Sequence, residues 1–200
     1  MKELQLRAYG KINLGLDVVR RREDGYHELR MIMQTVGSFD GLTMKVIPEN
    51  EIRLTTNLSF LPTNQNNLIY KAIALLKEEF GIKKGIEVRL EKRIPVAAGM
   101  AGGSSDAAAA LVGMNRLFRL GLSQKQLMEY GVRLGADVPY CVMRGTALSE
   151  GIGEILTPLS PMPECFILLA KPGISVSTKY VYQNLKLDEN TQHPNIDALI

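Results

Sequence analysis

The sequence has few of the residues that build metal sites or disulfide frameworks. Cysteine occurs only at Cys141 and Cys165, with no CxxC spacing, and histidine occurs only at His27 and His193. Zinc sites and disulfide scaffolds need several such residues at short spacings. We therefore expect no metal site built from these residues, and two free thiols in a reducing cytoplasm.

Long apolar runs and blocks of one charge are also missing. No apolar run approaches the roughly 20 residues that span a bilayer, and Met1–Arg7 lacks the apolar core of a signal peptide. The formal net charge is +3, and the densest basic run, Arg20–Arg22, is followed directly by Glu23–Asp24. Scattered charge of this kind is not the footprint of a nucleic-acid-binding protein. We expect a cytoplasmic protein without membrane or nucleic-acid partners, and the sequence does not indicate its oligomeric state.

The remaining pattern alternates between strand and helix signals. Alternation of apolar and polar residues predicts one or two strands over 4–19, around Gly10, and a strand over 86–91. It also predicts a hairpin from 42–47 and 51–56, and an apolar run predicts a buried strand over 165–170. Helical spacing predicts helices over 66–80, from about 104 to 120, and from Ser123, where Gln126 completes a capping box, to about 135. This order predicts an α+β fold. A proline-rich stretch over 157–163 predicts a boundary between a domain of residues 1–158 and a second one that begins at 159–200.

Residues 95–110, PVAAGMAGGSSDAAAA, are the most unusual segment of the chain. We expect Gly99, Gly102 and Gly103 to adopt positive φ and to let the backbone approach a ligand. We expect Ser104 or Ser105 to cap the helix that follows, whose first N–H groups favour an anion. The alternative is an ordinary glycine-rich turn before an alanine-rich helix. The number of glycines and serines, and the position between a strand and a helix, favour a phosphate-binding loop.

The loop does not fit the common nucleotide-binding signatures. The Walker pattern GxxxxGK[ST] and the Rossmann pattern GxGxxG are both absent. The HRD and DFG signatures of protein kinases are absent as well.

The segment from Pro95 to Ala108 instead resembles the phosphate-binding motif of the GHMP kinase superfamily, which includes galactokinase, homoserine kinase and mevalonate kinase. Four further segments are similar to those of the GHMP kinases that act on 4-diphosphocytidyl-2-C-methyl-D-erythritol: Lys11–Leu14, Asp24–His27, Leu134–Pro139 and Glu150–Leu156. The Lys171–Gly173 turn is similar too, so the resemblance covers nearly the whole chain.

The resemblance implies a fold and a reaction. The first domain would share the fold of ribosomal S5 domain 2, and a ferredoxin-like domain would follow. The superfamily carries a third glycine-rich motif in that second domain, and residues 1–200 do not contain it, so we expect an N-terminal part of a longer enzyme. The reaction implied is transfer of the γ-phosphoryl group of ATP, with Mg²⁺ as its counter-ion, to the 2-hydroxyl of the cytidine-diphosphate-bearing substrate in the non-mevalonate isoprenoid pathway.

The resemblance also assigns roles to individual residues. Asp137 would be the general base and Lys11 its electrostatic partner; from the sequence alone they are a helix N-cap and a solvated lysine on a strand. Substrate would be held by Asn13, Tyr26, His27 and Thr178, which are otherwise ordinary strand or turn residues. Asn67 and Lys92 would contact adenine, and the loop would hold the phosphates through Pro95, Val96, Ala97, Ala98, Gly99, Met100, Ala101, Gly102, Gly103, Ser104 and Ser105.

Two other functions fit part of the pattern. One is a GHMP kinase for homoserine or a mevalonate-like alcohol, but Tyr26 and His27 would then have no base to hold. The other is a GHMP-fold protein that binds a ligand without catalysis, but such a protein does not need both Lys11 and Asp137.

Overall fold

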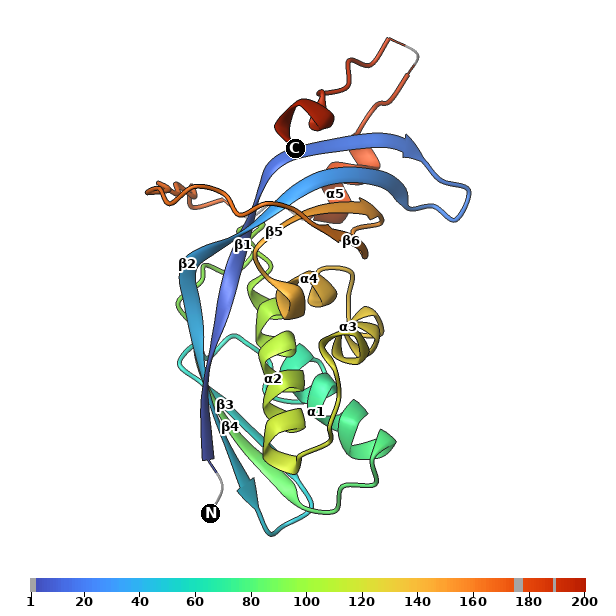
Figure 1. Cartoon of the computed structure of the whole chain (residues 1–200). Coiled ribbons are helices and arrows are strands. Elements are labelled where there is room, and N and C mark those ends of the chain that lie inside the picture. Colours follow the sequence, from blue (N-terminus) through green and yellow to red (C-terminus); the bar gives the residue numbers. More distant parts are fainter. Residues whose placement is uncertain (1–2, 175–177, 189) are drawn as a thin grey trace.

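Two long antiparallel strands organise the fold in the computed structural model, which describes residues 3–174, 178–188 and 190–200. β1 (Glu3–Arg21) pairs with β2 (His27–Ile47) over almost its whole length. The turn between them contains Gly25 at φ 86°. The register shifts between Tyr9 and Lys11, so a bulge at Gly10 helps the pair to bend (Figure 1). This confirms the strand predicted over 4–19.

The other strands add to the free side of β2. The sheet has the order β3-β4-β2-β5-β6, with β3 (Ile52–Thr56), β4 (Gly85–Glu91), β5 (Thr146–Gly151) and β6 (Ile155–Pro158). The predicted hairpin of 42–47 and 51–56 is wrong, because β4 lies between these two strands and pairs in parallel with β3. β4 takes the inner position because it buries three apolar side chains, Ile86, Val88 and Leu90, whereas β3 buries only Leu54.

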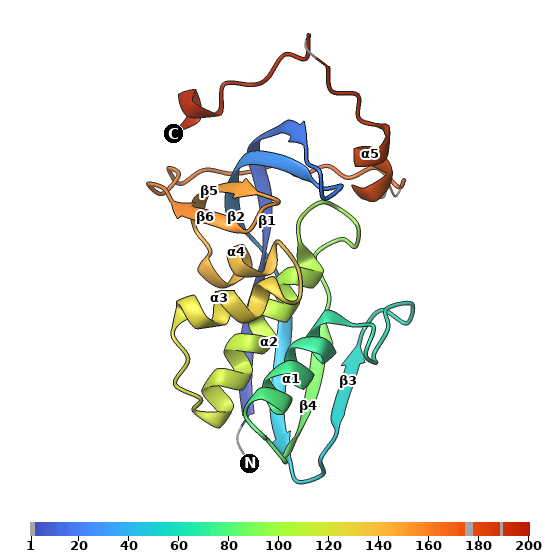
Figure 2. The same ribbon diagram turned by 90° about the vertical axis from the view of Figure 1, so that its right-hand side faces the viewer.

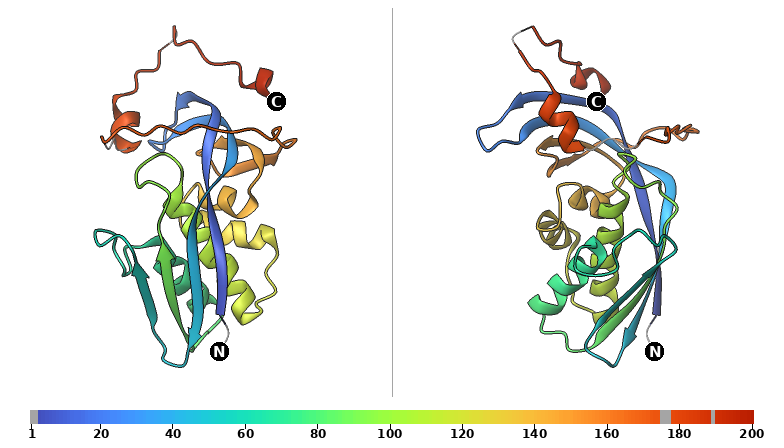
Figure 3. Two further views of the ribbon diagram at one scale, coloured as in Figure 1. Left: turned by 90° about the vertical axis from the view of Figure 1, so that its left-hand side faces the viewer. Right: turned by 180° about the vertical axis from the view of Figure 1, so that it is seen from behind.

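Four helices cover one face of the sheet, as Figure 2 shows, and leave the other face open, as seen in the left panel of Figure 3. They are α1 (Leu68–Glu79), α2 (Gly102–Phe118), α3 (Gln124–Val132) and α4 (Val138–Met143). α2 lies in the middle, and its buried residues Ala107–Ala110 let it pack closely on its neighbours. The capping box at Ser123 and Gln126 is confirmed. The three helices predicted after residue 65 are therefore present; α1 and α3 are a few residues shorter than expected, and α2 begins and ends two residues earlier.

The chain after β6 contains little regular structure. Its described elements are α5 (Thr178–Asn184) and the 3₁₀ helix η1 (Ile196–Leu199). The buried strand predicted over 165–170 is wrong: these residues form no strand, and Phe166 and Leu168 are fully exposed. The apolar pattern is real, but no described strand lies beside it to pair with its backbone. Farther along, η1 packs on the open face of the sheet, where Ile196 is buried beside Ile32 and Leu148 (Figure 3).

Two predictions made from the composition concern the cysteines and membrane-spanning helices. Both cysteines are free thiols, with Cys141 buried and Cys165 exposed. Within the described ranges, no helix combines the length and the apolar character needed to cross a membrane.

Candidate active site

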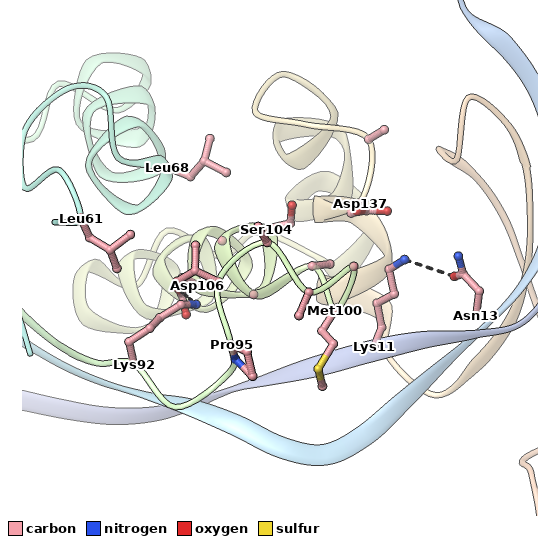
Figure 4. A pocket seen from close by; sticks show the side chains of 18 of the residues that line it. Lys11, Asn13, Leu61, Leu68, Lys92, Pro95, Met100, Ser104, Asp106 and Asp137 are labelled. Carbon is pink, nitrogen blue, oxygen red and sulfur yellow. Dashed lines mark hydrogen bonds and ion pairs between the residues drawn. The ribbon is translucent and has the colours of Figure 1, made fainter. Parts of the chain in front are cut away.

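A cavity of about 690 Å³ opens between β1, the loop that precedes α2, and the N-terminal ends of α1 and α4 (Figure 4). It gathers most of the residues predicted for catalysis and for nucleotide binding, although they come from distant parts of the chain. Those that line it are Lys11, Asn13, Asn67, Lys92, Asp137 and residues 95–104. The cavity is large enough for a nucleotide and a small acceptor.

The predicted phosphate loop forms one wall of this cavity. Gly99 has a φ of 70°, as predicted, but Gly102 and Gly103 do not adopt positive φ, and Ala97 and Ala101 do so instead, at 54° and 52°. Gly102 is required for a different reason. A Cβ atom there would lie 2.8 Å from Nζ of Lys92 and 3.2 Å from Cγ2 of Ile94. At Gly103 the nearest atom would be 3.7 Å away, which is an ordinary contact.

The start of α2 is not capped by a serine. Ala101 occupies the N-cap position, and no side chain accepts a hydrogen bond there. The prediction that Ser104 or Ser105 caps the helix is wrong, because α2 begins at Gly102, ahead of both, and the Ser105 hydroxyl donates to the Tyr9 carbonyl at 2.6 Å. The first N–H groups of α2 therefore have no side-chain acceptor and adjoin the cavity, where they suit an anion.

Lys92 lies in the wall behind the loop, between two buried carboxylates. Its Nζ donates to Oδ2 of Asp40 at 2.5 Å and to Oδ2 of Asp106 at 2.8 Å. Oδ1 of Asp40 accepts the backbone N–H groups of Arg93 and Ile94. Lys92 and Asp106 line the cavity, whereas Asp40 is fully buried. The lysine predicted to contact adenine thus has a structural role in holding the β4–loop junction.

Asp106 is the less satisfied member of this group. Its Oδ1 is buried and has no hydrogen-bond partner among the described residues. Burial raises the pKa of Asp106 from 3.8 to about 7, because Lys92 offsets only part of the desolvation cost and Asp40 adds repulsion. Burial therefore favours the protonated form of Asp106.

Asp137 and Lys11 face the same part of the cavity from opposite sides, as the side chains in Figure 4 show. Asp137 is the N-cap residue of α4 by position, but its carboxylate makes no capping hydrogen bond. Lys11 is buried, and its Nζ donates to Oδ1 of Asn13 at 3.1 Å. No ion pair joins Lys11 to Asp137 among the described residues, so the space between them is open to a third group.

Asn67 has a structural role at the start of α1. Its Oδ1 accepts the N–H of Ile69 at 2.8 Å as the cap of α1, and its Nδ2 donates to the carbonyl of Pro62 at 2.8 Å. It still lines the cavity, beside Leu68 and Leu61.

Tyr26 and His27 lie outside the main cavity, in a neighbouring one of about 510 Å³. Leu29, Ile152 and Tyr182 line both cavities, so the two are adjacent. His27 stacks on Tyr182 of α5, with ring centroids 5.0 Å apart and planes inclined by 23°. Tyr26 is 60% exposed, on the turn that Asp24 holds by accepting the Tyr26 N–H at 3.0 Å. This second cavity thus combines three rings, two of them predicted.

The remaining predicted residue, Thr178, is the first residue of α5, and its side chain is outside the described part of the structure. Three residues near the predicted set were not foreseen. Tyr182 separates the two cavities, and burial, followed by the charge of Asp137, raises its pKa. Asp40 and Asp106 hold Lys92. Only Asp106 had a sequence signal, because it lies in the segment that carries the glycine-rich loop.

Comparison with known proteins agrees with this geometry. Residues 67–145 match the family model of the GHMP kinases N terminal domain. A 4-diphosphocytidyl-2-C-methyl-D-erythritol kinase from Lachnoclostridium phytofermentans is 60% identical over all of this chain, which spans 69% of that enzyme. An enzyme of the same name from Lachnospira eligens is 61% identical, with the same coverage.

Solved structures agree as well. The crystal structure of a 4-(cytidine 5'-diphospho)-2C-methyl-D-erythritol kinase matches 98% of this chain and 69% of its own, at a TM-score of 0.80 and 33% identity. A homoserine kinase from Cytophaga hutchinsonii shares the fold at a TM-score of 0.67 and 18% identity, over 100% of this chain and 64% of its own. The α+β fold is thus that of the GHMP kinases, which are ATP-dependent small-molecule kinases. The chain belongs to the 4-diphosphocytidyl-2-C-methyl-D-erythritol kinase family.

Proposed function

We propose that this protein transfers the γ-phosphoryl group of ATP to the 2-hydroxyl of 4-diphosphocytidyl-2-C-methyl-D-erythritol, a step of the non-mevalonate isoprenoid pathway. The observation that carries the proposal is the meeting of three parts in adjacent cavities. These are a phosphate loop at an uncapped helix, a free carboxylate opposite a lysine, and an aromatic cavity beside them.

The nucleotide would lie along the loop. The N–H groups at the start of α2 would receive the phosphates, because they lack protein acceptors and carry the positive end of the helix dipole. Gly102 lets the start of α2 pack closely on Lys92 and Ile94, which keeps these N–H groups at the edge of the cavity. The adenine would contact the wall near Asn67 and Lys92.

The transfer step needs a base for the alcohol and positive charge for the phosphoryl group. Asp137 would accept the proton of the 2-hydroxyl. At the same time the hydroxyl oxygen of the substrate would attack the γ-phosphorus, and the bond between that phosphorus and the bridging oxygen of ADP would break. Its carboxylate suits this role because no capping hydrogen bond occupies it. Lys11, oriented by Asn13, would stabilise negative charge on the transferring group.

Mg²⁺ would enter with ATP rather than reside in the protein. The described residues contain no cluster of three His, Cys, Asp or Glu side chains that could hold a metal ion by themselves. Nucleotide-bound Mg²⁺ needs only one or two carboxylates in addition to the phosphates. Asp106 fits this need, because its Oδ1 has no partner and the residue lines the cavity beside the loop. When bound, the ion would neutralise charge on the phosphates.

The cytidine would occupy the second cavity. Tyr26 offers an exposed ring for stacking, and His27 and Tyr182 form the opposite wall. Because this cavity adjoins the first, a cytidine diphosphate held there would direct its sugar alcohol towards Asp137. Asn13 and Thr178 would complete the contacts.

We also propose that residues 1–158 form the ATP-binding and catalytic domain and that a C-terminal domain begins at 159–200. The described sheet ends with β6 at Pro158. Cytoplasmic localisation stays a prediction.

The test is ADP release, measured in a coupled assay with the cytidylated alcohol and, separately, with homoserine and mevalonate. We expect turnover with the cytidylated alcohol alone. Preference for homoserine or mevalonate would contradict the proposed substrate, and ATP binding without turnover of any alcohol would support a ligand-binding protein instead.

A further inference from the structure

A closed ring of three hydrogen bonds lies next to the active site, on residues to which no role has been assigned so far. Tyr140 of α4 is 1% exposed, and its hydroxyl donates to the Gly145 carbonyl at 2.7 Å. The Gly145 N–H donates to Oγ1 of Thr35 at 3.0 Å. Oγ1 of Thr35 lies 3.0 Å from Oη of Tyr140 and closes the ring.

The direction of each bond follows from the number of hydrogens. Tyr140 has one hydroxyl hydrogen, which the Gly145 carbonyl accepts, so towards Thr35 it can only accept. Thr35 must therefore donate its own hydroxyl hydrogen to Tyr140. Burial raises the pKa of Tyr140 to about 12, so the phenol keeps its proton at physiological pH. All three bonds are satisfied at once, and removal of either hydroxyl opens the ring.

The ring joins β2, the pairing partner of the strand that carries Lys11, to α4, which begins after Asp137. Thr35 lies on β2 directly opposite Lys11 of β1, and the Lys11 N–H donates to the Met100 carbonyl in the phosphate loop. On the other side, Tyr140 is in α4, one turn after Asp137. The ring is therefore an indirect link, through β2, between the strand of Lys11 and the helix that follows Asp137.

This connection matters because it adds hydrogen bonds to the packing that positions α4, whose residues Val138–Val142 are buried against α2 and α3. The Asp137 side chain makes no capping hydrogen bond, so its position depends on where α4 lies. α4 has only 6 residues, and it ends in a tight turn with Arg144 at φ 64° and Gly145 at φ 84°. The ring holds this turn against β2, together with the backbone hydrogen bond that the Thr35 N–H donates to the Gly145 carbonyl at 3.0 Å. Neither Tyr140 nor Thr35 lines either cavity, so neither can contact the substrate directly.

We propose that Tyr140 and Thr35 are positioning residues for phosphoryl transfer, which act by fixing the distance between Lys11 and Asp137 across the acceptor site. This rests on the proposed roles of those two residues. A shift of about 1 Å in a reacting group can cost roughly 100-fold in rate. The ring should therefore affect the rate constant and leave binding of either substrate unchanged.

The test compares Tyr140→Phe and Thr35→Val with two controls in the full-length enzyme. Thr35→Ser keeps the hydroxyl. Thr146→Val removes a nearby hydroxyl, which donates to Gln34 at 2.6 Å and has no bond to α4. We expect Tyr140→Phe and Thr35→Val each to lower kcat by about 10- to 100-fold with KM unchanged for both substrates. Both controls should keep near-wild-type kcat.

A second measurement separates positioning from stability. In an Asp137→Asn background, Tyr140→Phe should cause little further loss of kcat, because it acts through Asp137. The proposal is overturned if Tyr140→Phe and Thr35→Val lower only Tm while kcat stays near wild type, or if the losses add fully in the double variant. If Tyr140→Phe does not fold, the Thr35→Val and Thr35→Ser pair decides. Wild-type kcat in Asp137→Asn itself would instead contradict the proposed function.

Discussion

Replacing Asp106 by asparagine should stabilise the protein by about 4 kcal/mol at pH 8 and by less than about 2 kcal/mol at pH 5. The folded protein raises the pKa of Asp106 from 3.8 to about 7, so between these values the folded state keeps a proton that the unfolded chain releases. Stability therefore falls as the pH rises through this window. The pKa rises by about 3 units, and each unit corresponds to about 1.4 kcal/mol, so the ionised carboxylate costs up to about 4 kcal/mol above pH 7.

Asparagine mimics the neutral carboxyl in shape and can still accept from Lys92, so Asp106→Asn removes this cost. Urea unfolding of nucleotide-free wild type and variant at pH 5 and pH 8 measures it. The matched control is Asp40→Asn. Asp40 accepts from Lys92 and from two backbone N–H groups, so its replacement should destabilise at both pH values, by about 3–5 kcal/mol for a broken buried pair. If Asp106→Asn destabilises the protein at pH 8, the ionised form is the stabilising one and the reasoning is wrong.

Three further predictions concern the site. Gly102→Ala should weaken ATP binding in calorimetry, because the new Cβ would lie 2.8 Å from Nζ of Lys92. Gly103→Ala is the control and should bind ATP normally, because its Cβ would be 3.7 Å from the nearest atom. Equal ATP affinities of the two variants would mean that the phosphates do not bind at this loop. Tyr26→Ala and His27→Ala should raise KM for the cytidylated substrate by about tenfold, since stacking of one base is worth roughly 1–3 kcal/mol, and leave KM for ATP unchanged. A rise in KM for ATP alone would mean that ATP, and not the cytidine, occupies the cavity of Tyr26 and His27. Lys11→Met should lower kcat with circular dichroism unchanged, and an unaltered kcat would remove it from the transfer step.

The sequence predicted which residues line the cavity better than it predicted the residues that hold them in place. The cavity contains Lys11, Asn13 and Asp137, which come from segments that resemble the family, and also Lys92, which lies just before the loop motif. Asp40 has no such signal. It is one carboxylate among many until β2 and β4 pair and bring it to Lys92.

The errors in the fold have a common cause, because a local sequence pattern does not show which distant segment a strand or helix end will contact. Residues 42–47 and 51–56 look like a hairpin, but β4, which comes later in the chain, pairs with both strands. Residues 165–170 look like a buried strand, but no described strand lies beside them. Ser104 looks like a cap, but the alanine at 101 adopts positive φ and starts the helix earlier.

The central claim, that Asp137 is the general base, is tested most directly by kinetics and ATP binding of Asp137→Asn. This change keeps the size of the side chain and removes its basicity, and no capping hydrogen bond is lost, because Asp137 makes none. The account predicts a loss in kcat of at least about 100-fold with the cytidylated substrate, while the Kd for ATP stays at the wild-type value. A kcat close to wild type would contradict the account.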